Sequence, residues 1–157
     1  MATIFLSIGT NLGERRKNIS KAIKLLKKSV GRCVKISDLY ISKAWGFESE
    51  NEFMNVAAEF ETSLQPLELL KTTQQIEHLL GRIDKTQNVE YSDRIIDIDI
   101  LFYNNQIIDL PHLTIPHPLL HKRNFVLIPL AEIAPELQHP VLNKSIKQLA
   151  KELQKSN

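Results

Sequence analysis

The stretch SDRIIDIDILFYN, Ser92–Asn104, determines how the rest of the chain is interpreted. Apolar residues dominate it, which predicts a buried β-strand. Two acidic residues, Asp97 and Asp99, interrupt the apolar run. Successive side chains of a strand point to opposite faces, so the two carboxylates share one face. We expect the opposite face to pack under helices through Ile96, Ile98, Ile100 and Phe102.

Together with the elements that precede it, this strand completes the order β-α-β-β-α-β. Helical spacing of apolar residues, glycine and proline punctuation, and β-branched runs predict a strand at 3–9, a helix ending before Gly31, strands at 33–42 and 53–64, and a helix from Pro66 to Gly81. This order is typical of the ferredoxin-like fold. The expected class is α+β, with an antiparallel sheet and helices on one face.

The part after the central strand is predicted as a C-terminal addition. Residues 104–109 suggest a turn and a short strand. Residues 110–137 hold five of the seven prolines, which favours irregular backbone. A last helix is expected at about 145–154. With 157 residues the whole chain, 1–157, is expected to form a single domain.

Composition excludes several classes of protein. The net charge of +2 gives no strong case for a nucleic-acid partner, and no run approaches the ~18 apolar residues of a membrane span. The single Cys33 excludes an intrachain disulfide, and the N-terminus lacks the features of a signal peptide. A cytoplasmic protein without membrane contact is expected. The basic face of the first helix, which includes Arg15 and Arg16, is interpreted as a solvated surface.

The aspartate pair suggests a metal site. Neighbouring carboxylates repel each other unless a cation lies between them, and Mg²⁺ often binds one or two carboxylates together with substrate phosphates. Arg82 and Arg94, before the strand, supply groups that bind phosphate oxygens. This pattern is typical of metal-assisted phosphoryl transfer. From the spacing alone, an exposed polar face with two ordinary acids stays an alternative. The Gly9–Gly13 region lacks the ending of a Walker loop.

Five segments together resemble one family of enzymes. They are IFLSIGTNLGER, FMNVAAEFETSL, GRI, RIIDIDILFYNNQII and LTIPHPLLHKRNFVLIPLAEIAPEL, which span nearly all of residues 3–137. In order and spacing they resemble the 6-hydroxymethyl-7,8-dihydropterin pyrophosphokinases of folate biosynthesis. The resemblance implies transfer of pyrophosphate from ATP to the pterin hydroxymethyl group, with release of AMP.

The same resemblance implies residue roles. Asp97 and Asp99 would bind two Mg²⁺ ions, and Arg82 and Arg94 would stabilise charge on the transferred group, with Asp97 a candidate proton acceptor. ATP would be bound by Gln74, Glu77, Ile100, His112, Leu113, Thr114, His117 and Arg123. The pterin would be bound by Ser42, Lys43, Ala44, Trp45, Gly46, Phe53, Asn55 and Phe125. The expected partners are ATP and the pterin, and the chain is expected to be a monomer.

Several of these residues have structural alternatives. Phe53 and Phe125 are also typical core aromatics, Asn55 is also typical of a solvent-facing amide, and His117 between prolines is also typical of a structural hydrogen-bonding group. The sequence also departs from the family around 42–46 and 83–93, where Tyr91 is a candidate for the usual loop aromatic.

Two other functions share the predicted topology. A palm-type nucleotidyl transferase would release pyrophosphate rather than AMP, and the small net charge argues against it. An RNA-binding module would need exposed aromatics on its central strands, where this chain has Asp97 and Asp99. In the pyrophosphokinase hypothesis, loops at 9–13, 43–52 and 83–93 close over the substrates, and product release then limits turnover.

Overall fold

The computed structural model describes residues 1–43, 52–81 and 95–156. Their elements, in chain order, are β1 (Ala2–Thr10), α1 (Arg15–Ser29), β2 (Gly31–Ile36), β3 (Tyr40–Ser42), β4 (Phe53–Thr62), α2 (Pro66–Leu79), β5 (Asp97–Tyr103), β6 (Ile108–Leu110), β7 (Leu113–Ile115), the 3-10 turn η1 (Leu120–Lys122), α3 (Asn124–Ile133) and α4 (Ile146–Lys155).

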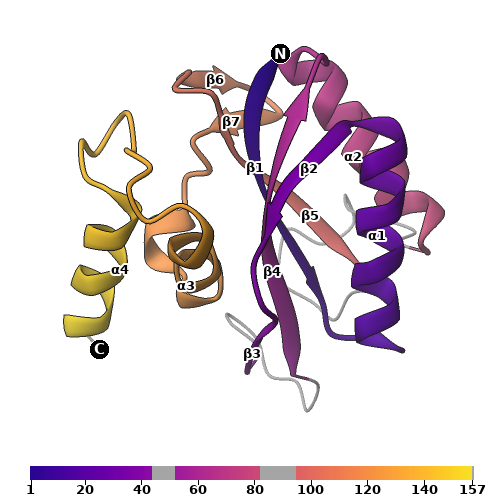
Figure 1. Cartoon of the computed structure of the whole chain (residues 1–157), viewed down its shortest axis with the longest axis horizontal. Coiled ribbons are helices and arrows are strands. Elements are labelled where there is room, and N and C mark those ends of the chain that lie inside the picture. Colours follow the sequence, from indigo (N-terminus) through magenta and orange to yellow (C-terminus); the bar gives the residue numbers. More distant parts are fainter. Residues whose placement is uncertain (44–51, 82–94, 157) are drawn as a thin grey trace.

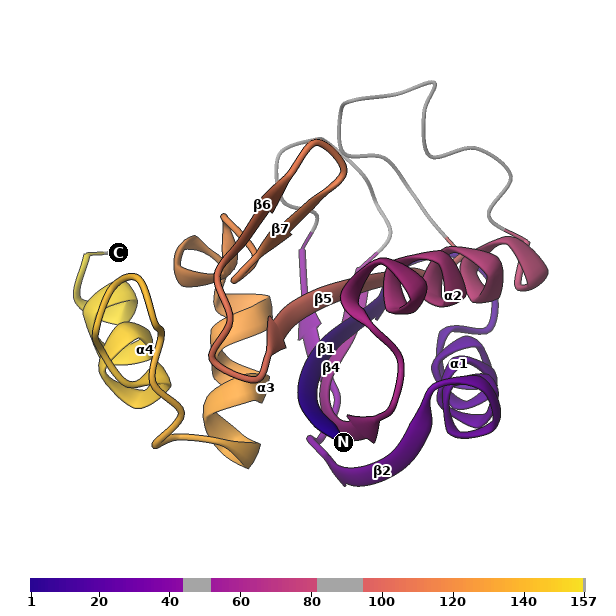
Figure 2. The ribbon, with the colours of Figure 1, turned by 90° about the horizontal axis from the view of Figure 1, so that it is seen from above.

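The main sheet is antiparallel and has the strand order β2-β4-β1-β5, with β3 paired to the outer part of β4. The hairpin β6-β7 forms a separate small sheet. This order confirms the ferredoxin-like α+β prediction. Figure 1 shows that helices cover both faces: α1 and α2 lie on one side of the sheet, and α3 and α4 lie on the other. The two helices of the ferredoxin-like part thus share one face, as predicted, and the helices of the C-terminal addition cover the other face. Figure 2 shows the same layering from above.

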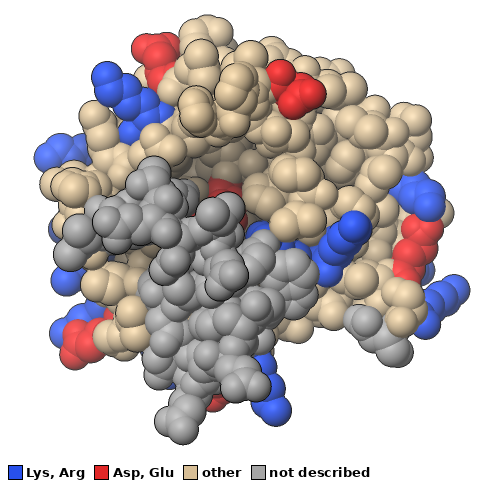
Figure 3. Space-filling view, turned by 180° about the vertical axis from the view of Figure 1, so that it is seen from behind, with Lys and Arg blue, Asp and Glu red and all other residues tan. Residues whose placement is uncertain are grey.

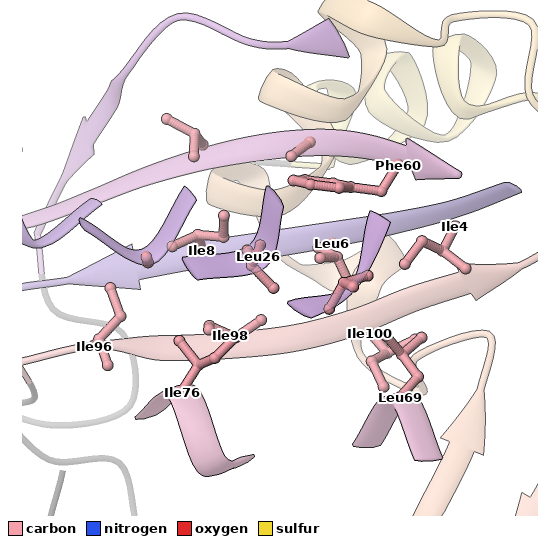
Figure 4. Packing of buried hydrophobic residues seen from close by; sticks show 14 of the residues in the cluster. Ile4, Leu6, Ile8, Leu26, Phe60, Leu69, Ile76, Ile96, Ile98 and Ile100 are labelled. Atoms are coloured by element: carbon pink, nitrogen blue, oxygen red, sulfur yellow. The ribbon is translucent and has the colours of Figure 1, made fainter. Parts of the chain in front are cut away.

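The core between the sheet and the helices α1 and α2 follows the predicted alternation. Ile96, Ile98 and Ile100 are each at most 5% exposed and join this core. They face Leu69 and Ile76 of α2, as Figure 4 shows. The apolar side of this strand is thus buried, which leaves its other side for the carboxylates.

The alternation ends at a β-bulge. Between Phe5 and Leu6 the β1-β5 register shifts, because Phe5 pairs with Phe102 whereas Leu6 pairs with Ile100. Leu101 is the extra residue, and both Leu101 and Phe102 enter the second core, under α3 and α4. The prediction that Phe102 shares a face with the isoleucines is therefore wrong.

The chain between residues 33 and 42 forms two strands rather than the one predicted. Ser37 lies between β2 and β3, where its hydroxyl accepts a hydrogen bond from the backbone N–H of Ala57 at 2.9 Å. This side-chain contact replaces a ladder bond at the break. A second irregularity shifts the register of β2 between Cys33 and Lys35.

The proline-rich part contains a helix, α3, that the sequence prediction missed. Pro129 lies inside it, and α3 nevertheless packs on the sheet through Val126, Leu127, Leu130 and Ile133. Burial of this apolar face outweighs the cost of the proline. The C-terminal helix prediction is confirmed, since the Ser145 hydroxyl caps α4 by accepting from the backbone N–H of Gln148 at 3.1 Å. Among the described residues, no helix is long and apolar enough to cross a membrane.

Candidate active site

The two aspartates lie side by side on β5, at the end of the sheet. Asp97 pairs with Gly9 of β1, and Asp99 pairs with Ser7. Both side chains are partly exposed, whereas Ile98 between them is buried on the opposite face. The structure therefore confirms that the two carboxylates share the face away from α1 and α2. Figure 3, which views the molecule from behind, shows an acidic side chain at the base of a hollow.

A third carboxylate fixes the same strand from the side of α2. Glu77 is 2% exposed, and its Oε2 accepts a hydrogen bond from the backbone N–H of Ile98 at 2.7 Å. β5 is the outer strand of the sheet, so this N–H is satisfied by a helix side chain rather than by another strand. Glu77 therefore holds the backbone between the two aspartates, a structural role that the sequence prediction did not include.

A cavity of about 460 Å³ lies along β5, between α2 and the segment that contains β7. Most of the residues that the sequence assigned to ATP line it, together with one predicted metal ligand. They are Gln74, Asp99, Ile100, His112, Leu113, Thr114 and His117. Residues from three separate parts of the chain thus meet in one cavity that also contains a metal-ligand candidate. Glu77 and Arg123 are not among its lining residues.

Two of the ATP candidates, His117 and Arg123, have side chains that contact other parts of the protein. The Nδ1 of His117 accepts a hydrogen bond from the backbone N–H of Leu119 at 3.2 Å, which fixes the orientation of the ring. Arg123 is 5% exposed, precedes α3, and stacks over the Phe125 ring at 5.5 Å. Burial lowers the pKa of Arg123 to about 10, so the guanidinium is still charged at neutral pH. A buried cation beside an aromatic ring suits an anionic ligand.

The pterin candidates lie where β3 pairs with β4. Ser42 is opposite Phe53, and Asn55 is opposite Tyr40. Asn55 is 4% exposed, which excludes the solvent-facing alternative. Neither Asn55 Nδ2 nor Ser42 Oγ has a hydrogen-bond partner among the described residues, although both atoms are buried. Such an atom costs about 1–3 kcal/mol, so the pair favours a ligand that supplies the missing partners.

Gly9 makes room for the Asn55 amide. The two residues are paired in the β1-β4 register, and a Cβ at residue 9 would collide with Asn55 Oδ1. Gly9 was predicted as the last residue of a strand at 3–9 and the first of a loop at 9–13; it lies in β1, which continues to Thr10. The sequence prediction missed its contact with a candidate ligand-binding residue.

The other pterin candidates divide into two groups. Phe125 is partly buried against the core under α3 and α4, Phe53 is partly exposed at the start of β4, and Lys43 is exposed. The predicted residues that lie outside the described part of the chain are Ala44, Trp45, Gly46, Arg82 and Arg94, and the loop aromatic Tyr91 lies there as well.

The aspartate pair fits a hard cation that completes its shell with ligand oxygens. Both carboxylates lie on one face of β5, and Asp99 lines a cavity large enough for a ligand. Within residues 1–43, 52–81 and 95–156, no group of three or more His, Cys, Asp and Glu side chains could hold a metal ion by itself. Two carboxylates with substrate phosphates are the usual Mg²⁺ arrangement, so the donor set fits.

Comparison with known proteins identifies the family to which the chain belongs. Residues 5–135 match the model of the family described as 7,8-dihydro-6-hydroxymethylpterin-pyrophosphokinase (HPPK). The chain is 41% identical over 152 residues to the 2-amino-4-hydroxy-6-hydroxymethyldihydropteridine pyrophosphokinase of Aquifex aeolicus, which covers 97% of this chain and 92% of that protein. It is 42% identical over 141 residues to the protein of the same name from Porphyromonas gingivalis, covering 89% and 95% of the two chains.

Solved structures show the same fold. A crystal structure of an HPPK-DHPS protein in complex with substrates aligns with a TM-score of 0.77 at 18% identity, covering 99% of this chain and 44% of that longer one. Plasmodium falciparum HPPK-DHPS, wild type with SDX-DHP, aligns with a TM-score of 0.76 at 20% identity, covering 97% and 43%. This chain thus spans less than half the length of these proteins.

Proposed function

Since this chain belongs to the 7,8-dihydro-6-hydroxymethylpterin-pyrophosphokinase family, we propose that it transfers pyrophosphate from ATP to the hydroxymethyl oxygen of 6-hydroxymethyl-7,8-dihydropterin in folate biosynthesis. The products are the pterin diphosphate and AMP. The single observation that carries the proposal for the site is the cavity that joins Asp99 to the candidate nucleotide residues.

In this proposal the cavity beside β5 binds ATP. Gln74, Thr114 and His117 supply polar contacts, while Ile100 and Leu113 supply apolar surface for the base or the ribose. Arg123 adds positive charge near the start of α3. The triphosphate then reaches the end of β5, where Asp97 and Asp99 lie.

The pterin lies beyond the triphosphate, against β3 and β4. Asn55 Nδ2 and Ser42 Oγ, both buried, pair with the polar edge of the pterin ring. Phe53 and Phe125 flank the ring faces. The hydroxymethyl group then points toward the carboxylate pair, because Asn55 and Asp97 are paired with the same residue of β1, Gly9.

The reaction forms one bond and breaks one. The hydroxymethyl oxygen attacks the β-phosphorus of ATP, the bond from the β-phosphorus to the oxygen of the α-phosphate breaks, and AMP leaves. Asp97 and Asp99 would hold two Mg²⁺ ions, which would neutralise phosphate charge and lower the pKa of the hydroxyl. Asp97 is the candidate acceptor for the released proton. Arg82 and Arg94 are proposed to stabilise the transferred group, and the protein to act as a cytoplasmic monomer.

The test follows AMP and pterin diphosphate with purified protein, ATP, MgCl₂ and 6-hydroxymethyl-7,8-dihydropterin. We expect AMP only when the pterin is present. Asp97→Asn and Asp99→Asn should each lower kcat by roughly 10²-fold or more, as when one electrostatic group is removed from an active site. Glu136→Gln is the matched control, because Glu136 is an exposed carboxylate after α3. Release of pyrophosphate instead of AMP would indicate a nucleotidyl transferase and contradict the proposal.

A further inference from the structure

The side chain of Asn18, in the first turns of α1, connects two segments at the edge of the candidate site. Its Nδ2 donates a hydrogen bond to the carbonyl oxygen of Leu12 at 2.8 Å. The same nitrogen lies 3.4 Å from the carbonyl oxygen of Ile95 and 3.4 Å from Thr10 Oγ1. Leu12 and Thr10 belong to the end of β1 and the turn after it, whereas Ile95 comes two residues before Asp97.

This connection continues the β1-β5 pairing past its last residue pair. The register of the two strands ends at Gly9 and Asp97, and among the described residues no ladder pair continues it beyond that point. Asn18 bridges the same two strands there, with the two donors of one amide group. The position of the Asp97 backbone is therefore fixed on one side by the ladder and on the other by Asn18.

The helix that carries Asn18 is itself fixed to the sheet. Arg15 Nη1 donates to the carbonyl oxygen of Glu52 at 2.6 Å, and Glu52 directly precedes β4. Ile19 is 4% exposed in the core. The sequence predicted Arg15 as part of a solvated basic face, but this contact gives it a partner. Asn18 can hold another segment in place only if α1 itself is fixed. Arg15 and Ile19 fix α1 to the sheet.

We infer that Asn18 is a positioning residue, which holds the start of β5 so that Asp97 keeps its place beside Asp99. The effect of Asn18 on Asp97 passes through the backbone at Ile95. This inference rests on the proposed function for its kinetic test only. Outer residues that orient metal ligands typically change metal affinity or activity by about 10- to 100-fold when they are removed.

Two substitutions of Asn18 distinguish loss of its hydrogen-bond donors from loss of its side-chain volume. Asn18→Ala removes both donors. Asn18→Asp keeps the shape but replaces the donors by acceptor oxygens, which repel the carbonyl oxygens of Leu12 and Ile95. The aspartate variant should therefore be impaired at least as strongly as the alanine variant.

Thr62→Val provides the matched control at the far end of the same sheet. Thr62 Oγ1 donates to the carbonyl oxygen of Val30 at 2.7 Å, and Thr62 pairs with Ala2 at the opposite end of β1. Thr62 Oγ1 also accepts from the backbone N–H of Leu64 at 3.1 Å. Loss of the two hydrogen bonds should lower the free energy of unfolding by about 1–3 kcal/mol without touching the site.

The experiment measures kcat, both KM values and the Mg²⁺ concentration for half-maximal rate. For Asn18→Ala we expect that Mg²⁺ concentration to rise by about 10-fold and kcat to fall, with a smaller change in the KM for the pterin. Thr62→Val should leave all four values unchanged. If Asn18→Ala lowers stability like Thr62→Val and leaves the Mg²⁺ dependence unchanged, the inference is wrong.

Hydrogen exchange of the ligand-free proteins gives a readout that does not depend on activity. In Asn18→Ala the amides of residues 96–99 should exchange faster than in the wild type, and in Thr62→Val they should not. A wild type that makes no AMP would refute the proposed function, and the exchange data would still decide on Asn18. Equal exchange at these residues in both variants would overturn the positioning role.

Discussion

The Glu77 carboxylate of α2 accepts a hydrogen bond from the backbone N–H of Ile98, at 2.7 Å, between the two aspartates of β5. Glu77 of α2 thus supplies the acceptor for a backbone N–H on the outer edge of β5. Asp97 and Asp99 of the same strand lie on the face away from α2. The family resemblance assigned Glu77 to ATP binding, but in the structure its carboxylate is buried against the strand.

Replacement of Glu77 by alanine should destabilise the protein. The N–H of Ile98 would lose its acceptor in a buried place, which costs about 1–3 kcal/mol. Glu77→Gln keeps an acceptor oxygen and should lose less. Urea unfolding of the ligand-free variants measures the difference. Equal free energies of unfolding for Glu77→Ala and the wild type would show that the hydrogen bond contributes nothing to stability.

Asn55→Ala should weaken pterin binding without a matching loss of stability. Each hydrogen bond lost to the ring raises the Kd by about 10-fold, whereas the ligand-free protein gives Nδ2 no partner to lose. Titration with the pterin and urea unfolding measure the two quantities separately. A large stability loss with unchanged pterin affinity would place Asn55 in the core rather than in the site.

Gly9→Ala should act on the pterin through Asn55. The added Cβ collides with Asn55 Oδ1, so the amide must turn away from its present orientation. We expect a raised KM for the pterin and a nearly unchanged KM for ATP, because Gly9 does not line the cavity beside β5. Combining Gly9→Ala with Asn55→Ala should add little, which a double-mutant cycle tests. Additive effects would contradict the shared cause.

Mildly acidic pH should destabilise the C-terminal part through His139. Burial lowers the pKa of His139 from its ordinary value near 6.5, and His121 lowers it further. Its Nδ1 accepts from the backbone N–H groups of Val141 and Leu142 at 3.2 and 3.1 Å, so the folded protein favours the neutral ring. The unfolded chain takes up a proton first, and stability is therefore lost as the pH falls from about 6.5 toward the lowered folded pKa.

The measurement is the urea midpoint at pH 7.5 and at pH 5. His139→Asn is the informative variant, because its Oδ1 can accept the same two hydrogen bonds but does not titrate. Its midpoint should depend less on pH than that of the wild type. An identical pH dependence in both proteins would assign the effect to other groups.

The sequence predicted the features that depend on short-range pattern. Alternation predicted the shared face of Asp97 and Asp99, and a last helix was expected at about 145–154, where α4 lies. The sequence prediction failed for features that depend on contacts between distant parts of the chain. The bulge that turns Phe102 depends on pairing with β1, and α3 forms around Pro129 because it buries an apolar face against the sheet.

The candidate site shows the same division. The motif match supplied the residues that line the cavity, since these lie in short conspicuous segments. The contacts of Asn18 and Gly9 escaped prediction because each joins residues far apart in the chain. The pairing of Gly9 with Asn55 in the neighbouring strand can be recognised only when the strand order is known.

The shifted register of β2 bears on how copies of the protein meet. β2 is an outer strand of the main sheet, and its outer edge has no partner strand among the described residues. An open strand of this kind invites a strand from a second copy, but an irregularity with charged side chains makes a poor template for it. Here the shift lies between Cys33 and Lys35, and Arg32 adds a second cation. The outer edge of β2 is thus a poor template for strand-by-strand aggregation.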